Sequence, residues 1–201
     1  MCLIKIRETM KEPFQMKSYE ITSAAALAAI SASLQLVHIG WMSPWGMWLD
    51  LVAIPWLIAY FLYGGRSALI VSLVGALIIT FLDPSTWLGA LMKWLATLPM
   101  WLAPFVTQKV SRMKLPDFRK PLILLPILAA AIMLRAAITI PVNYYFAIPI
   151  WTGLSTVEAM SIIPWWAILL MNAAQGVIEV AVAWLLVFRF RLDRFAAWQS
   201  K

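Results

Sequence analysis

Residues 51–82 read LVAIPWLIAYFLYGGRSALIVSLVGALIITFL, which is two apolar runs that meet at Gly64 and Gly65. The only charged residue in this stretch is Arg66, directly after the two glycines. Glycine commonly ends a helix because it adopts backbone conformations that other residues avoid, and a glycine pair also favours a turn. The stretch therefore predicts two short apolar helices, over 49–64 and 66–82, joined by a tight turn.

The rest of the chain is similarly apolar. Of its 201 residues, 63% are hydrophobic and 12% are charged, whereas soluble domains average about 45–50% and about 25%. A bilayer core of about 30 Å requires about 20 helical residues, and apolar runs of roughly that length recur along the chain. We therefore predict an all-α integral membrane protein of the cell membrane, with six transmembrane helices over 20–38, 49–64, 66–82, 87–108, 121–146 and 161–188.

The sixteen lysines and arginines indicate how these helices are oriented. Fourteen of them lie before the first segment, between the second and third, between the fourth and fifth, or after the sixth. If six helices alternate, these cations share one side, which the positive-inside rule assigns to the cytoplasm. We therefore expect a cytoplasmic segment over 1–19, a transmembrane domain over 20–192 and a cytoplasmic tail over 193–201. Because the cations flank apolar runs, the net charge of +7 does not indicate a nucleic-acid partner.

Two further cations, Lys93 and Arg135, lie inside predicted spans. A charge at the bilayer centre costs about 2.5–3.5 kcal/mol on insertion scales, so it is rarely retained without a partner or a use. Lys93 is close enough to a helix end to reach the interface or to form an ion pair. Arg135 lies deeper and indicates a polar binding cavity or a buried pair.

Polar side chains form stripes along three predicted spans, at spacings that place each stripe on one helix face. The stripes are Arg135, Thr139 and Asn143 in the fifth span, Asn172, Gln175 and Glu179 in the sixth, and Lys93 and Thr97, beside Trp94, in the fourth. Lipid cannot satisfy such groups, so we expect them to face a shared cavity in the outer half of the membrane. Glu179 lies closer to the cytoplasm and could instead serve packing or a partner surface. The alternative for the whole set is polar contact between helices.

Tryptophans are concentrated near the predicted outer side. The chain has twelve, and the outer group consists of Trp41, Trp45, Trp48, Trp87, Trp94, Trp151, Trp165 and Trp166. An interfacial aromatic belt accounts for most of them. An excess on one side also suits rings that stack on a flat ligand, and we select Trp41 and Trp94 as candidate ligand contacts.

No residue pattern indicates catalysis. Asp50, Asp83 and Glu158 are isolated and do not have the spacing of an acid–base pair. With one histidine and one cysteine, the chain has no metal-binding pattern, and it has no phosphate-binding loop. We therefore expect no catalytic or metal-ligating residues and no cofactor, and any transport must be driven by a gradient or a partner.

The first predicted span is unusually rich in small residues. One row consists of Ala24, Ala28 and Ala32, and the adjacent row consists of Ala25, Ala29 and Ser33. Small residues let helix backbones approach closely in lipid, where van der Waals packing drives association. One row could serve packing inside the chain, whereas two adjacent rows form a broad smooth face suited to a partner.

Four collinear segments resemble a known membrane family. They are LDLVAIPWLIAYFLYGGRSALIVSLVGALI at 49–78, with Asp50, Pro55, Ala59 and Gly64 at its key positions, GALMKWLAT at 89–97, NYYFAIPIW at 143–151 and IIPWWAILLMNAAQG at 162–176. In this order they are similar to the riboflavin-type S components, the substrate-binding subunits of energy-coupling factor (ECF) transporters. The sequence departs from the family pattern at Lys93, where Asn is usual, at Gly75–Ala76, where Lys-Asn is common, and at Gln175, near a family Lys.

The resemblance implies a six-helix prokaryotic membrane subunit that binds a vitamin and has no catalytic activity. The implied pocket lies between the outer loops and the outer halves of the last three helices, and riboflavin or a related flavin is the implied ligand. The implied partners are a transmembrane coupling subunit and two ATPases, with docking through the alanines of the first helix, namely Ala24, Ala25, Ala28, Ala29 and Ala32.

Three alternatives remain open from the sequence. The ligand could be another vitamin or precursor, whose carboxylate Lys93 or Arg135 could neutralise. The chain could be a membrane enzyme acting on a lipid or prenyl substrate, although such enzymes usually show clustered carboxylates or histidines. It could also be an accessory membrane subunit without a ligand.

Overall fold

The computed structural model describes residues 18–37, 40–82 and 87–199. Its main helices are α2 (Ser18–Val37), α3 (Ile54–Tyr63), α4 (Gly65–Leu82), α5 (Trp87–Val110), α6 (Pro121–Val142) and α9 (Trp165–Trp184). They correspond in order to the six apolar segments of the sequence. Three helical runs, Ser18–Val37, Pro121–Thr152 and Trp165–Arg189, are long and apolar enough to cross a membrane. The chain is therefore a membrane protein whose described part is mostly helical.

Helix α3 is the centre of the bundle. Every residue from Ile54 to Leu62 is buried, and the helix contacts α2, α4 and α9. With ten residues, it is about 15 Å long, half the thickness of a bilayer core. Pro55 occupies its first turn, where a missing N–H costs no hydrogen bond. Gly64 ends it at a φ of 95°, a left-handed conformation that favours glycine, so the predicted junction with α4 is confirmed.

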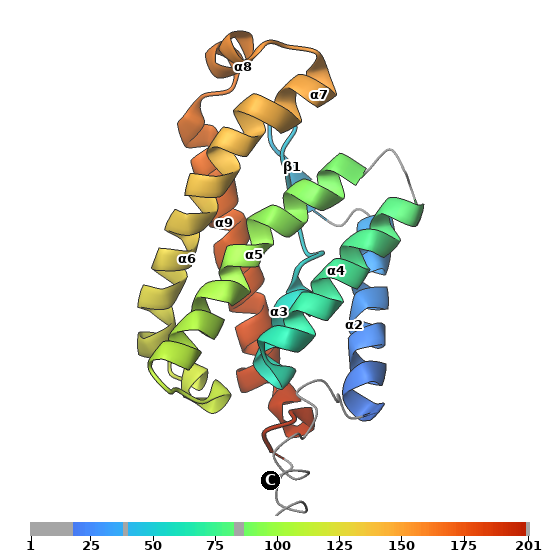
Figure 1. Ribbon diagram of the computed structural model, residues 1–201, viewed down its shortest axis with the longest axis vertical. Coiled ribbons are helices and arrows are strands. Elements are labelled where there is room, and N and C mark those ends of the chain that lie inside the picture. Colours follow the sequence, from blue (N-terminus) through green and yellow to red (C-terminus); the bar gives the residue numbers. More distant parts are fainter. Residues whose placement is uncertain (1–17, 38–39, 83–86, 200–201) are drawn as a thin grey trace, which may run out of the picture.

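Residues 40–50 form a β-hairpin, which the all-α prediction did not include. Strand β1 (Gly40–Met42) pairs antiparallel with β2 (Trp48–Asp50), with Trp41 opposite Leu49. The predicted second span over 49–64 is therefore too long at its start, because 48–50 are extended and paired. Figure 1 shows the hairpin above α3, and its strand β2 contacts α9.

The long helical run from Pro121 changes register near its end. A π-helical turn, η3 (Asn143–Ala147), separates α6 from α7 (Ile148–Thr152). The next helix, α8 (Thr156–Ile162), is separate from α9, because Pro164 follows an extended Ile163. The predicted spans over 121–146 and 161–188 thus differ from the structure at these ends.

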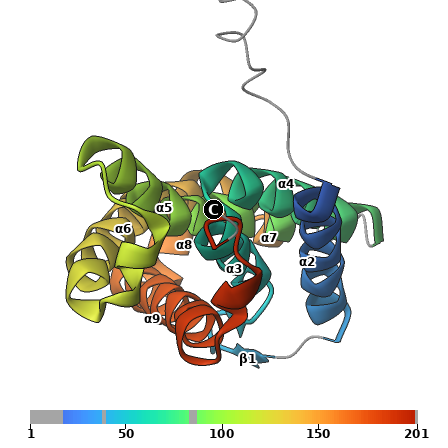
Figure 2. The same cartoon turned by 90° about the horizontal axis from the view of Figure 1, so that it is seen from below.

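The start of α2 and the C-terminal end lie at the same end of the molecule, the lower end in Figure 1 (see also Figure 2). The α5–α6 connection, which contains η2 (Leu115–Arg119), also lies there. A second π turn, η4 (Leu185–Arg189), and a short helix, η5 (Leu192–Phe195), close the chain. The expected tail packs against the bundle: Asp193 is buried and pairs with Arg119, and the indole of Trp198 donates to the Phe61 carbonyl.

Candidate functional site

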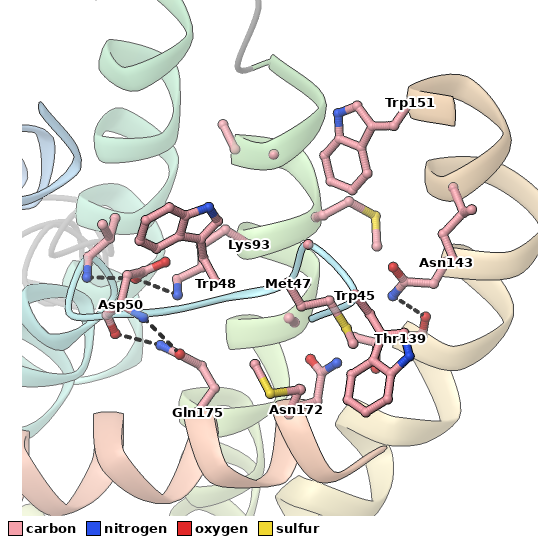
Figure 3. Close-up of a pocket in the computed structure, with 18 of the residues that line it drawn as sticks. Trp45, Met47, Trp48, Asp50, Lys93, Thr139, Asn143, Trp151, Asn172 and Gln175 are labelled. Atoms are coloured by element: carbon pink, nitrogen blue, oxygen red, sulfur yellow. Dashed lines mark hydrogen bonds and ion pairs between the residues drawn. The ribbon is translucent and has the colours of Figure 1, made fainter. Parts of the chain in front are cut away.

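A partly open cavity of about 550 Å³ lies above α3, lined by the hairpin and by α2, α4, α5, α6, α7 and α9 (Figure 3). Ligand sites for small organic molecules typically measure about 300–1,000 Å³. The cavity occupies the part of the bundle that α3 is too short to fill, and Val52 and Trp56 form its base. Its volume and position make it the candidate binding site.

Flat aromatic side chains contribute much of the lining. Trp45 and Trp48 come from the hairpin, Trp56 from α3 and Trp151 from α7. Trp56 is fixed, because its Nε1 donates to Ser31 Oγ at 2.8 Å. Indole faces in a cavity favour planar ligands that can stack on them.

A buried ion-pair network forms the polar wall. Lys93 Nζ lies 2.6 Å from Asp50 Oδ1 and 3.1 Å from Glu179 Oε1. Arg135 Nη1 lies 3.1 Å from Glu179 Oε2, and its Nε donates to Asn172 Oδ1 at 3.0 Å. Glu179 is fully buried and Arg135 almost so. Both cations that the sequence placed inside predicted spans are therefore paired with carboxylates of the same chain, as a buried charge requires.

Gln175 attaches the hairpin to this network. Its Oε1 accepts from the Asp50 backbone N–H at 3.0 Å, and its Nε2 donates to the Asp50 carbonyl at 2.7 Å. Nε2 also donates to Glu179 Oε1 at 2.6 Å. Asp50 Oδ1 accepts a further bond from the Val52 N–H at 2.9 Å. The position of Asp50 is thus fixed through both its backbone and its side chain.

The polar stripes predicted from the sequence converge on this cavity. Its lining includes Lys93, Arg135, Thr139, Asn143, Asn172 and Gln175. Asn143 lies at the start of the π turn and donates to the Thr139 carbonyl at 2.7 Å. Thr139 Oγ1 is buried and has no hydrogen-bond partner among the described residues. Thr139 lines the cavity, but its Oγ1 is covered by neighbouring atoms.

Three other candidate residues lie elsewhere. Trp41 is 57% exposed on the hairpin and does not line the cavity. Trp94 packs between helices, where its Nε1 donates to Ser72 Oγ at 3.1 Å. Thr97 is fully buried outside the lining, because its neighbour Ala96 takes the position that faces the cavity.

Sequence reasoning missed both carboxylates of the site. Asp50 was expected to be isolated, and this is wrong, because it pairs with Lys93. Glu179 was placed in the polar stripe of the sixth span, with packing or a partner surface as the alternative, and its bridge between Lys93 and Arg135 was not predicted. A signal was present: two intramembrane cations need counter-ions, and both carboxylates lie within predicted spans.

The other carboxylates do not suggest an acid–base pair. Glu158 forms a capping box with Ser155 at the start of α8, and Asp83 lies outside the described residues. Ser155 donates side-chain and backbone hydrogen bonds to the Glu158 carboxylate, which lowers the pKa of Glu158. Within the described ranges, no group of three His, Cys, Asp or Glu residues could hold a metal.

The two rows of small residues on α2 have different environments. Ala24, Ala28 and Ala32 are at most 6% exposed and pack against residues of α3 and α4. They are therefore not available as a docking surface in this structure, which corrects that part of the expectation. Ala25 and Ala29, in the adjacent row, are exposed.

Comparison with known proteins identifies the fold. No protein-family model matches the sequence, and no curated protein matches it. A solved structure described as the "Structure and mechanism of the S component of a bacterial ECF transporter" matches with a TM-score of 0.68 and 22% sequence identity. The match covers 87% of this chain and 96% of that chain. This chain therefore has the fold of an ECF-transporter S component.

Proposed function

We propose that this chain is the membrane-embedded substrate-binding subunit of an ECF-type uptake transporter. The observation that carries the proposal is the cavity, which combines planar aromatic walls with a pre-formed polar wall in a chain of S-component fold. The lower end, with the basic connections, then faces the cytoplasm, six helices span the cell membrane, and the cavity opens toward the outside.

Riboflavin or a related flavin is the ligand we favour. Its planar ring system suits the indole walls, and the collinear motifs resemble riboflavin-type S components. The polar wall adds support, because Lys93 and Arg135 are already paired with carboxylates of the chain and do not need the charge of an acidic ligand. The alternative of an acidic vitamin or precursor is correspondingly less favoured.

Docking on a transmembrane coupling subunit is assigned to the exposed row of α2. Ala25 and Ala29 present a smooth surface, whereas the buried row holds α2 to its own bundle. A coupling subunit and two ATPases would supply the energy, since the sequence has no phosphate-binding loop of its own.

The direct test is ligand binding by the purified chain in detergent. We expect riboflavin to quench tryptophan fluorescence with a Kd below micromolar, and the protein to carry yellow flavin from cells. Trp151→Ala should weaken binding, because Trp151 lines the cavity. Trp165→Ala is the matched control, because Trp165 is similarly exposed but lies outside this cavity.

Two outcomes would count against the proposal in different ways. Absence of riboflavin binding, with another small molecule found by native mass spectrometry, would change the ligand and keep the function. If native mass spectrometry and the fluorescence titration find no bound small molecule, the chain is an accessory subunit and the proposed function is wrong.

A further inference from the structure

We propose that the cavity selects an uncharged ligand and that Glu179 is the residue that sets this selection. The inference rests on the proposed function, since it concerns the ligand of that same cavity. Glu179 does not line the cavity itself. It contributes indirectly, because it is the counter-ion shared by Lys93 and Arg135, which do line the cavity.

The charges at the cavity balance. In the described part of the chain, the charged residues of the lining are Asp50, Lys93 and Arg135, and Glu179 lies directly behind them. Two cations thus face two carboxylates, at 2.6 and 3.1 Å for Lys93 and 3.1 Å for Arg135. The wall therefore presents polar atoms but no uncompensated charge.

The strongest alternative is that Asp50 only substitutes for the carboxylate of an acidic ligand and swings away when the ligand arrives. The contacts of Asp50 argue against this. Gln175 bonds both its N–H and its carbonyl, and the Val52 N–H bonds the same carboxylate oxygen that Lys93 contacts. The two bonds to Gln175 hold the Asp50 backbone in place, and rotating the carboxylate away would break both the Val52 N–H bond and the Lys93 ion pair.

A fixed, balanced wall discriminates by charge. An anion entering this cavity would lose part of its hydration and would find each cation already paired with a carboxylate. A neutral planar ligand loses less hydration and stacks on the indoles that line the cavity. Removing one carboxylate should leave one cation uncompensated and shift the preference toward anions.

The experiment compares pairs of compounds that differ by one anionic group. The probes are riboflavin with riboflavin 5′-phosphate, pyridoxine with pyridoxine 5′-phosphate, and nicotinamide with nicotinate. Each is titrated against the full chain in detergent at constant ionic strength, followed by tryptophan fluorescence. For any pair that binds, the wild-type protein should favour the neutral member by about tenfold or more.

Four variants test whether the carboxylates of the network cause the preference for the neutral member of each pair. Glu179→Gln keeps the side-chain shape and should reduce the neutral preference about tenfold or reverse it. Asp50→Asn, at the more exposed end of the network, should act in the same direction and provides a second route if Glu179→Gln folds poorly. Lys93→Gln combined with Glu179→Gln should restore the neutral preference. Asp193→Asn, which removes a buried carboxylate far from the cavity, should leave it unchanged.

The outcomes separate the two proposals. If no probe binds to the wild-type protein, this inference is refuted, and the assignment of a flavin as the ligand is refuted with it. If a probe binds and the anionic member is favoured, only the charge inference fails. It also fails if the two single carboxylate variants fold, bind and keep the wild-type ratio.

Discussion

Replacing Ser31 with alanine should loosen the junction between α2 and the base of the cavity. The Ser31 hydroxyl is fully buried, donates to the Val52 carbonyl at 2.7 Å and accepts from Trp56 Nε1 at 2.8 Å. Alanine would leave the carbonyl and the indole N–H without this partner. Each buried unsatisfied group costs about 1–3 kcal/mol, so we expect a loss of about 2–6 kcal/mol.

In a chain of this size, 1 kcal/mol corresponds to about 2–4 °C in Tm, so the midpoint should fall by at least about 4 °C. The assay heats the detergent-solubilised protein and measures the folded fraction by size-exclusion chromatography. Ligand affinity should also fall, because Val52 and Trp56 line the cavity. Ser33→Ala is the control: this exposed hydroxyl bonds only its own helix, at the Ala29 carbonyl. Equal midpoints for the two variants would refute the reasoning.

Three further predictions test other parts of the molecule. Ala29→Trp should abolish uptake by cells that make the coupling subunits while leaving ligand affinity intact. Ala28→Trp should instead reduce the yield of folded protein. Equal effects of the two variants on uptake and on yield would contradict the division of α2 into two faces. Asn172→Ala should weaken ligand binding about tenfold to a hundredfold, because it lines the cavity and accepts from the guanidinium at its wall; unchanged affinity would move the site. Ser155→Ala should raise the pKa of Glu158, which NMR can measure. Because the native pKa of Glu158 is lowered, the cap stabilises the folded protein at neutral pH, and this stabilisation disappears as the pH falls through that pKa. An unchanged pKa in the variant would contradict the capping assignment.

The fold followed from local patterns that one sequence can show. The glycine pair at Gly64, the proline at the start of α3 and the apolar runs each act over a few residues, so their positions predicted the helices well. The polar stripes were also local, since helical spacing alone placed Arg135, Thr139 and Asn143 on one face.

Contacts between distant segments could not be predicted in this way. Asp50 and Gln175 are 125 residues apart, and their bonds depend on how the hairpin folds over α3. The two rows of small residues on α2 have nearly the same chemistry, and the row that faces inward is the one beside the bonds that Ser31 forms with Trp56 of α3 and with the carbonyl of Val52, two residues before α3.

The shortness of α3 has a consequence for how binding proteins of this shape can diversify. Each residue added at its N-terminal end would raise the floor of the cavity by about 1.5 Å, and each residue removed would lower it. The surrounding helices α2, α4, α5, α6 and α9 would not need to change, because each is already longer than α3. Insertions and deletions near residue 52 can therefore change the depth of the cavity, and with it the size of the ligand that fits, without changing the polar wall that selects ligand charge.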